Sequence, residues 1–310
     1  MPNTNLTAAK KAKNDEFYTQ ISDIEAELQH YTQHFAGKVI YCNCDNPTWS
    51  NFWRYFHLNF EHFKLKKLIA SFYNPYQPVY SMEYNGGNDN NCEVGAKTPL
   101  QGNGDFRSSE CVELLKEADI IVTNPPFSLF REYVAQLMEY GKKFVIIGSM
   151  NAVTYKEIFP LIRDNRLWYG PSISSGDRKF GVPDSYLLNA SNCGVDENGQ
   201  KYIRVKGVRW FTNLDHSKRH KPIDLVEKYS PEKYPHYDNY SAINVDKTLD
   251  IPCNYDGVIG VPISFLDKYC PEQFRIIGLD RYVEDNPKPG YRFTLNGKET
   301  YARILIRKEK

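Results

Sequence analysis

The chain has 310 residues, with 39 Lys and Arg against 38 Asp and Glu, so its formal net charge is +1. This balance excludes a histone-like polycation and an acidic disordered chain, and a hydrophobic content of 41% is typical of a globular protein. No apolar run approaches the roughly 20 residues that span a bilayer, and the N-terminal segment lacks the apolar core of a signal peptide. The seven cysteines form no CxxC pair, which indicates neither a disulfide framework nor a zinc site. We expect a cytoplasmic protein without membrane attachment or metal.

The first part of the chain alternates helices and strands. Apolar residues at helical spacing predict a helix over 21–35, with a capping box at Ser22–Glu25 and an end at Gly37. Short apolar runs predict buried strands over 39–43 and 68–72, and Ser50 begins a second helix. The segment 85–104 is rich in Gly and Asn, which predicts turns or an exposed loop.

Regular alternation resumes after residue 108. The expected elements are a helix over 109–117, a buried strand over 119–123, a helix over 128–140, a strand over 143–148 and a helix over 155–164. This alternation predicts an α/β fold with a mostly parallel sheet covered on both faces, over about residues 20–215. Beyond residue 166 the pattern changes to short strands separated by turns, expected over 186–188, 202–210, 258–261, 275–279 and 302–306.

Charge is unevenly spread along the chain. Residues 201–235 hold nine Lys and Arg against four Asp and Glu, and they include the cluster His216–Lys221. A basic module downstream of a neutral core suits contact with phosphate groups. A solvated loop without a partner explains the same composition, so charge alone does not decide between the two.

The most informative motif follows the predicted strand 119–123. It reads Asn124, Pro125, Pro126 and Phe127, after which Ser128 is a candidate helix N-cap. In open α/β sheets, ligands bind beyond the carboxyl ends of the strands. Because proline has a fixed φ and no N–H, the two prolines hold a rigid turn. The Asn124 amide oxygen and the Pro125 carbonyl can therefore present two acceptors to one amino group.

Such a pair of acceptors suits the exocyclic amine of adenine. The lone pair of this nitrogen is delocalised into the ring, and two acceptors that bind both hydrogens favour a pyramidal nitrogen. They also stabilise the positive charge that develops when the nitrogen attacks a methyl group. Phe127 would stack on the base, which has to leave the duplex to reach the pocket. The alternative is a tight strand-to-helix turn without chemistry, but the motif at this position is rare by chance.

These motifs resemble the EcoRI-type adenine-specific DNA methyltransferases, a branch of the S-adenosylmethionine-dependent Rossmann-like enzymes. The resemblance implies S-adenosylmethionine as the methyl donor and double-stranded DNA as the substrate. It also implies a class I methyltransferase domain over 1–215 and a smaller α+β target-recognition region over 216–310. The resemblance covers most of the chain, in segments 14–20, 39–45, 104–107, 124–127, 175–178, 208–213 and 255–262.

The resemblance further implies which residues would hold the cofactor. One segment would close the methionine end, the tip of the first strand would hold the amino-acid portion, and a third segment would read the adenine. Core packing of the aromatic residues, an Asx-turn at Asp45 and a helix cap at Asp105 are the structural alternatives. The residues are Phe17, Tyr18 and Thr19; Asn43, Cys44 and Asp45; and Asp105 and Phe106.

Contacts with DNA would come from basic and aromatic residues downstream of the motif. Trp210 and Phe211 lie where the family is expected to flank the target base, although packing in the core is the simpler account of Trp210. Solvated surface charge is the alternative for the basic residues. The candidates are Arg178, Lys179, Arg209, Trp210, Lys218 and Arg219.

Two features depart from the family pattern. The first strand is followed by no glycine-rich turn, and 70–74 contains no acidic residue to bind the ribose hydroxyls. These departures leave open a catalytically inactive DNA-binding relative. Because Asn-Pro-Pro-aromatic turns also serve enzymes that methylate amines of RNA, cytosine or a protein glutamine, such a substrate stays open as well. We expect a monomer, because one adenine is modified per binding event. The sequence leaves open whether a partner restriction endonuclease exists.

Overall fold

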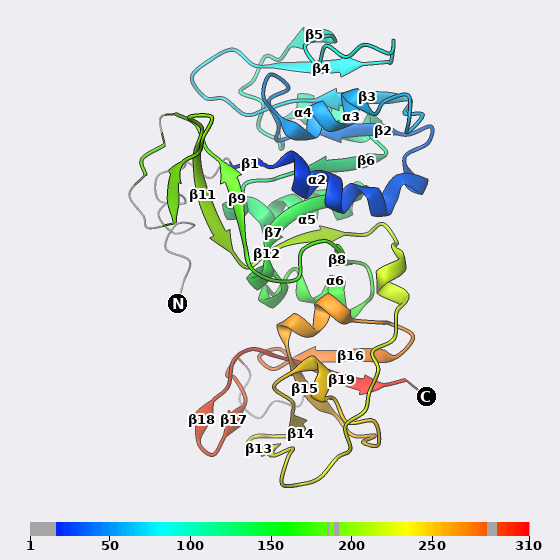
Figure 1. Cartoon of the computed structure of the whole chain (residues 1–310), viewed down its shortest axis with the longest axis vertical. Helices are drawn as coiled ribbons and strands as arrows, with labels where there is room; N and C mark the ends of the chain where they lie inside the picture. The colour runs from blue at the N-terminus through cyan, green and yellow to red at the C-terminus, as the bar shows by residue number, and fades with distance from the viewer. Residues whose placement is uncertain (1–16, 185, 189–191, 284–289, 310) are drawn as a thin grey trace. The chain divides into compact units, whose positions relative to one another are not determined.

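The computed structural model describes residues 17–184, 186–188, 192–283 and 290–309 (Figure 1). The chain forms two compact units. Unit 1 consists of Met1–Met150 and Ser175–Leu214, and unit 2 consists of Asn151–Ser174 and Asp215–Lys310. Within the described ranges, no helix is both long enough and apolar enough to cross a membrane.

A parallel sheet forms the centre of unit 1. Its strands are β3 (Lys67–Ala70), β2 (Val39–Cys42), β6 (Ile120–Thr123) and β7 (Lys143–Ser149), which lie side by side in that order. All three pairings are parallel, and every residue of β2 and β6 is buried. Burial on both faces explains why these strands read as continuous apolar runs. Because β3 lies on one side of β2 and β6 on the other, the strand order reverses between β2 and β6.

Antiparallel strands extend this sheet at both ends. On one side β4 (Tyr80–Tyr84) pairs with β3, and β5 (Ala96–Pro99) pairs with β4. On the other side β12 (Val208–Thr212) pairs with β7. The expectation of only turns or loop over 85–104 was therefore wrong for β5. All four residues of β5 are exposed, so no apolar alternation marks it as a strand.

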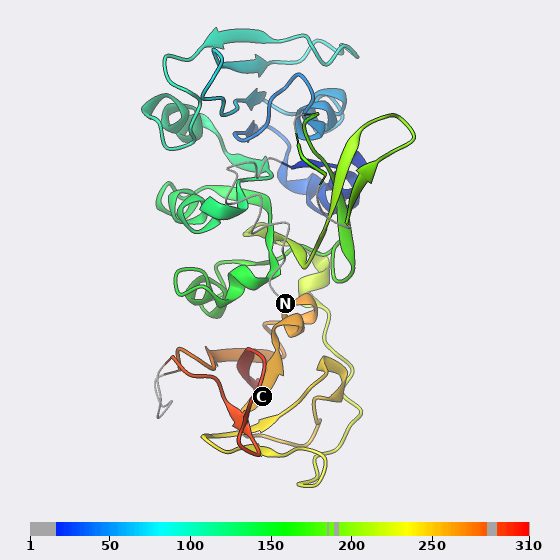
Figure 2. The same ribbon diagram turned by 90° about the vertical axis from the view of Figure 1, so that its left-hand side faces the viewer.

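Helices cover both faces of the parallel sheet. α2 (Ile21–Leu28) and α3 (Asn51–Leu58) lie on one face, and α4 (Ser109–Glu117) and α5 (Phe130–Glu139) lie on the other (Figure 2). A 3-10 helix, Gln29–His34, continues α2 toward the turn at residue 37. The structure is thus a mixed α/β fold, as the alternation of the sequence predicts.

One predicted helix cap and one predicted helix start were wrong. α2 begins at Ile21, as the apolar spacing predicts, but its N-cap is Gln20 and not Ser22, because the Gln20 carbonyl accepts from Asp23 N at 3.1 Å and from Ile24 N at 3.2 Å. Ser128 is not the N-cap of α5. It lies inside a 3-10 turn, Phe127–Leu129, and α5 starts only at Phe130. By contrast, Ser50 caps α3 as expected, its hydroxyl accepting from two backbone amides.

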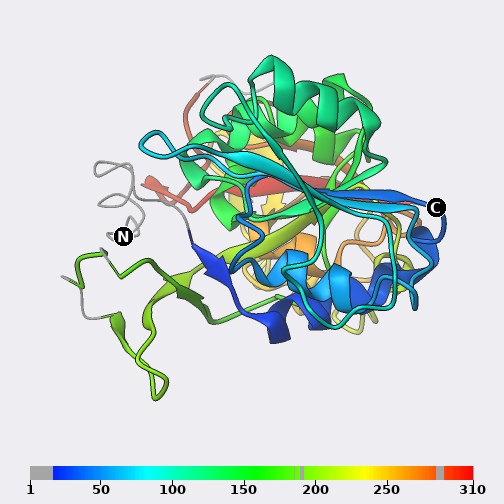
Figure 3. The same cartoon turned by 90° about the horizontal axis from the view of Figure 1, so that it is seen from above.

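A second, antiparallel sheet in unit 1 contains the N-terminal strand. Its order is β1 (Tyr18–Thr19), β9 (Asp177–Gly181), β11 (Lys201–Lys206) and β10 (Cys193–Val195). In Figure 3, β9 and β11 extend to one side of the large sheet. The single strand predicted over 202–210 is divided between β11 and β12 by Gly207, whose φ is +69°. The strand predicted over 186–188 was wrong, since these residues have no regular structure.

Unit 2 has its own mixed sheet and a buried core. Its strand order is β13-β14-β15-β19-β16, and helix α6 (Phe159–Arg163), shorter than the predicted 155–164, contacts β16. The residues of unit 2 also form the short strand β8 (Trp168–Tyr169) and the hairpin of β17 (Thr294–Leu295) and β18 (Lys298–Glu299). The sheet strands are His236–Tyr237, Tyr240–Asn244, Ile259–Pro262, Arg303–Lys308 and Phe274–Leu279. The 3-10 turns are Met150–Thr154, Ser217–His220, Thr248–Asp250 and Ile263–Lys268.

Candidate active site

The carboxyl ends of β2 and β6 lie next to each other, where the strand order reverses. The Asp45 carboxylate, just after β2, accepts from the Thr123 hydroxyl at the end of β6 and from the Ser50 hydroxyl at 3.0 Å. Asp45 N also donates to the Ser71 carbonyl at 3.0 Å. Asp45 therefore connects the ends of three strands with the start of α3. In the turn that follows, the side chain that accepts from Thr48 N is that of Asn46.

Asn124 holds its amide in one defined orientation. Its Nδ2 donates to the Phe17 carbonyl at 2.7 Å, while its Oδ1 is buried and accepts from no described residue. Because a carbonyl can only accept, this contact fixes the NH₂ group and turns the amide oxygen away from Phe17. A buried oxygen without a donor is rare and is expected where a ligand completes the site.

The backbone of the two prolines offers a second acceptor. The Pro126 carbonyl accepts from Leu129 N at 3.0 Å, so it is used by the 3-10 turn. The Pro125 carbonyl accepts from none of the described residues. Together with the Asn124 oxygen it gives the two acceptors that the sequence motif predicts.

Three aromatic rings from different segments lie beside this turn. Phe17 precedes β1 and is buried, with its ring centroid 5.9 Å from that of Phe127 in an edge-to-face arrangement. Phe180 on β9 lies 6.0 Å from Phe17. Phe127 itself is only half-buried, so one part of its ring is accessible. A partly open ring beside two amine acceptors suits a flat heterocycle.

Two more buried polar atoms without partners come from the predicted cofactor residues. They are Thr19 Oγ1 and Asn43 Nδ2. The Thr19 carbonyl accepts from Asn51 Nδ2 at 2.7 Å, which holds β1 against α3. The Asn43 amide oxygen accepts from the Tyr133 hydroxyl. The two orphan atoms can donate to a polar ligand, and thereby recover the free energy that an unpaired buried group costs.

Asp105 and Phe106 lie next to the end of β3. Gly104 has a φ of +76°, and a Cβ there would lie 1.9 Å from the Phe72 carbonyl oxygen, so only glycine allows this close approach. Asp105 forms a two-bond ion pair with Arg107, at 2.7 and 2.9 Å. This contact lowers the pKa of Asp105, which keeps the carboxylate ionised as an acceptor. Ser108, and not Asp105, caps α4.

The candidate DNA contacts in unit 1 are engaged within the protein. Trp210 is fully buried in β12 and packs edge-to-face on Phe52 at 6.1 Å, in agreement with the packing alternative. Arg209 is 3% exposed. Arg178 Nε lies 3.7 Å from Asp23, and Lys179 forms an ion pair of 2.9 Å with Asp196. The accessible members of this set are therefore Arg178 and Lys179, each half-buried.

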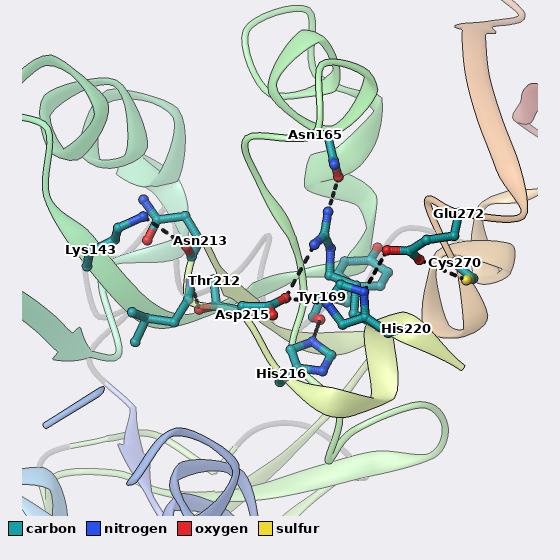
Figure 4. A network of polar contacts seen from close by, with 12 residues as sticks. Lys143, Asn165, Tyr169, Thr212, Asn213, Asp215, His216, His220, Cys270 and Glu272 are labelled. Atoms are coloured by element: carbon teal, nitrogen blue, oxygen red, sulfur yellow. Dashed lines mark hydrogen bonds and ion pairs between the residues drawn. The ribbon is translucent and has the colours of Figure 1, made fainter. Parts of the chain in front are cut away.

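The candidate contacts in unit 2 belong to the 3-10 turn Ser217–His220 (Figure 4). Arg219 donates to Asn165 and to Asp215, at 3.3 Å for the latter, and its guanidinium lies 3.9 Å above the Trp168 ring. Lys218 is exposed and donates to the Pro171 carbonyl at 2.7 Å. Arg219 is thus a packing residue, and Lys218 is the accessible cation of the pair.

His220 adds a charged contact to the same network. It lies between Asp215 at 2.8 Å and Glu272 at 2.7 Å, and these two carboxylates raise its pKa. The charge cluster predicted over 216–221 is therefore partly neutralised by Asp215, which directly precedes it, and by Glu272, which is distant in sequence and which local composition does not reveal.

Two residues in the site were missed from the sequence. Tyr133 and Asn51 donate to Asn43 and to the Thr19 backbone, from 90 and 32 residues away in sequence. Each lies on an amphipathic helix and has no local signal that distinguishes it from an ordinary helix residue. Among the described residues, no group of three or more His, Cys, Asp or Glu is arranged to hold a metal ion.

The comparison with known proteins gives a coherent result. The family described as "Adenine-specific methyltransferase EcoRI" matches residues 5–309. The Type II methyltransferase M.EcoRI of Escherichia coli is 48% identical, over 98% of this chain and 96% of its own length. Type II methyltransferase M.MpnI of Mycoplasma pneumoniae is 39% identical, over 96% of each chain. No solved structure gave a significant match.

The match extends over residues of both units and includes the Asn-Pro-Pro-Phe turn. The resemblance inferred from the sequence motifs is confirmed, and with it the adenine-specific methyltransferase function. The chain belongs to the EcoRI family of adenine-specific methyltransferases.

Proposed function

We propose that this enzyme methylates the exocyclic 6-amino group of an adenine that is flipped out of double-stranded DNA. The observation behind this proposal is the Asn124 amide, whose nitrogen is held by the Phe17 carbonyl and whose buried oxygen lacks a donor. When bound, S-adenosylmethionine would supply the methyl group on a positively charged sulfur.

Asn124 and Pro125 act on the amine in two ways. Their oxygens accept the two amino hydrogens and place the nitrogen in line for attack on the methyl carbon. They also stabilise the positive charge that the nitrogen gains as the new bond forms. As the nitrogen–carbon bond forms, the bond between the methyl carbon and sulfur would break, and the sulfur would keep the electron pair. The extra proton then passes from the nitrogen to solvent water. Pro126 keeps the turn rigid throughout. Phe127 stacks on the base and replaces the stacking lost on leaving the duplex.

The residues around the turn fit the proposed cofactor. Asn43 Nδ2 and Thr19 Oγ1 offer buried donors that suit the carboxylate of its amino-acid portion. Asp105, held ionised by Arg107, suits the amino group of its adenine, with Phe106 beside it. Phe17 and Tyr18 would line the cofactor pocket at the methionine end of the cofactor. Cys44 and Asp45 shape the tip of β2, with Asp45 acting through its strand-to-strand contacts.

The division of labour between the units follows from the same site. Unit 1, with its parallel sheet and its reversal of strand order, would be a Rossmann-like catalytic domain, covering most of the predicted 1–215. Unit 2, which includes 216–310, would contribute to target recognition through Lys218, with Arg178 and Lys179 of unit 1 as further phosphate contacts. We propose that the enzyme acts as a monomer and pairs with a restriction endonuclease, since its relatives are named Type II methyltransferases.

The test is methylation of unmethylated duplex DNA with S-adenosylmethionine, followed by mass spectrometry of the nucleosides. We expect N6-methyl-2′-deoxyadenosine with the wild type and at least a ~100-fold lower rate with Asn124→Ala. The matched control is Asn59→Ala, which also loses an Nδ2 bond to a backbone carbonyl (Tyr55, 2.8 Å) but lies outside the site.

The other outcomes separate the competing functions. Methylation of cytosine, RNA or a protein glutamine in place of adenine would move the proposal to that substrate. Cofactor binding without any methylated product on varied DNA would do the same. No binding of the cofactor would indicate an inactive relative. An Asn124→Ala enzyme as active as the Asn59→Ala control would contradict the assigned role of the amide.

A further inference from the structure

The position of Tyr133 relative to the candidate site has a consequence for ligand binding. Tyr133 lies on α5 and is fully buried. Its hydroxyl donates to Oδ1 of Asn43, a residue that is itself only 2% exposed. Burial raises the pKa of Tyr133 well above its usual range, so the hydroxyl keeps its proton and remains a donor.

This contact decides which end of the Asn43 amide is available. An amide has one accepting and one donating end, and the Tyr133 hydroxyl donates to the accepting end, where the Cys44 thiol adds a weaker donor at 3.9 Å. The NH₂ group then points the other way, where it is buried and has no partner among the described residues. A ligand group that faces Asn43 must therefore accept hydrogen bonds.

Tyr133 also contacts the second half of the proposed cofactor pocket. Its ring centroid lies 5.1 Å from that of Phe106 in an edge-to-face arrangement, and Phe106 is 5% exposed. The hydroxyl and the ring of one side chain thus support two segments, Asn43 and Phe106, which lie 63 positions apart in the sequence.

We infer that Tyr133 is a positioning residue, which orients the Asn43 amide so that its N–H groups bind a carboxylate, that of the cofactor's amino-acid portion. The inference rests on the proposed function and deepens it by naming the ligand group that Asn43 reads. It also assigns the two parts of Tyr133 separate tasks: the hydroxyl serves the amino-acid portion, and the ring supports the nucleoside portion.

Two probes separate these tasks. S-adenosylhomocysteine contains the amino-acid portion, and 5′-methylthioadenosine is the same thioether nucleoside without it. We expect Tyr133→Phe, which keeps the ring, to lower the affinity for S-adenosylhomocysteine about tenfold in a calorimetric titration. Its effect on 5′-methylthioadenosine should stay within about twofold, because no carboxylate is present to lose its donor.

The chain offers a closely matched control. The Tyr237 hydroxyl in unit 2 donates to Oδ1 of Asn244 at 2.8 Å, and both side chains are 5% exposed. Tyr237→Phe removes the same kind of buried contact away from the site and should leave both affinities unchanged. Asn43→Asp keeps the acceptor for Tyr133 but replaces the NH₂ group by an oxygen. Asn43→Asp should lower the affinity for S-adenosylhomocysteine at least as much as Tyr133→Phe does, and leave the affinity for 5′-methylthioadenosine unchanged.

The outcomes distinguish this inference from the proposed function. Equal weakening of both probes by Tyr133→Phe would show a general structural role and overturn the inference, as would no weakening of either. The wild type could methylate adenine while Tyr133→Phe and Asn43→Asp leave the ratio of the affinities for the two probes unchanged. That result would overturn only the role assigned to Tyr133. If the wild type binds neither probe, the proposed function fails as well.

Discussion

At the scale of single residues, the site depends on two amide groups whose orientation is fixed by hydrogen bonds to one of their two ends. The Phe17 carbonyl holds the NH₂ end of Asn124, and the Tyr133 hydroxyl holds the oxygen end of Asn43. The first amide is left to accept and the second to donate. The proposed ligands, an amine and a carboxylate, complement these two amides, and they belong to the two substrates of an amino-methyltransferase.

The half-buried ring of Phe127 gives the first prediction. Stacking of a base on an aromatic side chain contributes about 1–3 kcal/mol, which is about 5- to 150-fold in affinity. Phe127→Ala should therefore raise the KM for DNA by an amount in this range, while the affinity for S-adenosylhomocysteine stays unchanged. Phe127→Tyr keeps the ring and should remain near the wild type. The KM for duplex DNA is measured by steady-state kinetics. Equal KM values for Phe127→Ala and Phe127→Tyr would contradict the stacking role of the ring.

Asp280 gives a prediction about stability and pH. It is fully buried in unit 2, and this burial raises its pKa to about 6. A carboxyl group whose pKa is raised in the folded state contributes fully to the free energy of unfolding below its unfolded pKa, near 3.8. This contribution is lost as the pH rises through its folded pKa of about 6. At pH 7 the buried charge thus lowers the free energy of unfolding by up to about 3 kcal/mol.

Asp280→Asn keeps an oxygen for the Arg281 backbone amide, which donates to Asp280 Oδ1 at 2.9 Å, but has no charge. We expect it to raise the melting temperature at pH 7 and to lose this advantage near pH 4. Thermal unfolding measured across pH 4–8 tests the sign. A variant less stable than the wild type at pH 7 would show that the ionised carboxylate is needed.

At the scale of elements, close approach of the backbone positions the Asp105 segment. Gly104 lies with its Cα against the Phe72 carbonyl, where a Cβ would be 1.9 Å from the oxygen. Since the backbone fixes the position of a Cβ and the Phe72 oxygen is itself a backbone atom, no side-chain rotation relieves the clash. Gly104→Ala should displace Asp105 and Phe106, and lower the affinity for S-adenosylhomocysteine by about tenfold or more.

Gly37 is the matched control for this change. Its φ of +72° is close to the +76° of Gly104, but nothing lies within 4 Å of a Cβ at Gly37. Gly37→Ala should cost only the strain of the left-handed backbone, about 1 kcal/mol, and leave ligand affinity unchanged. Equal effects of the two substitutions in titration and thermal unfolding would mean that backbone strain, and not the contact with Phe72, explains the loss.

The elements that the sequence predicts well are those whose burial is continuous. β2 and β6 are buried at every position, and apolar runs therefore locate them to within a residue. β5 has no buried residue, so its place in the sheet depends entirely on backbone pairing with β4. The wrong N-cap predicted for α2 has a local cause, since Gln20 and Ser22 lie only two residues apart.

The candidate site was predictable only where the motif is local. Asn124 to Phe127 are contiguous, and proline chemistry alone indicates a rigid turn with free acceptors. The fixed direction of the amides is not predictable in this way, because it depends on Phe17 and Tyr133, 107 and 90 residues from their partners. Lone hydroxyls and backbone carbonyls have no periodicity in the sequence that would reveal such contacts.

At the scale of the whole molecule, each unit has the requirements of an independent folding unit. Unit 1 buries its parallel sheet under helices on both faces, and unit 2 has its own core, which includes Tyr237, Phe293 and Leu305. A unit with its own core can unfold in a transition of its own. The proposed cofactor pocket lies entirely within unit 1, so the ligand should act on one unit only.

Calorimetric unfolding tests this separation. At a concentration 100 times its Kd, S-adenosylhomocysteine should stabilise unit 1 by about 2.7 kcal/mol. This corresponds to a rise of about 5–10 °C in the melting temperature of one transition, at 2–4 °C per kcal/mol. Asp280→Asn should move the other transition at pH 7, which identifies that transition as unit 2. If the ligand and the substitution shift the same single transition, the two units unfold together, and target recognition and catalysis are then parts of one cooperative structure.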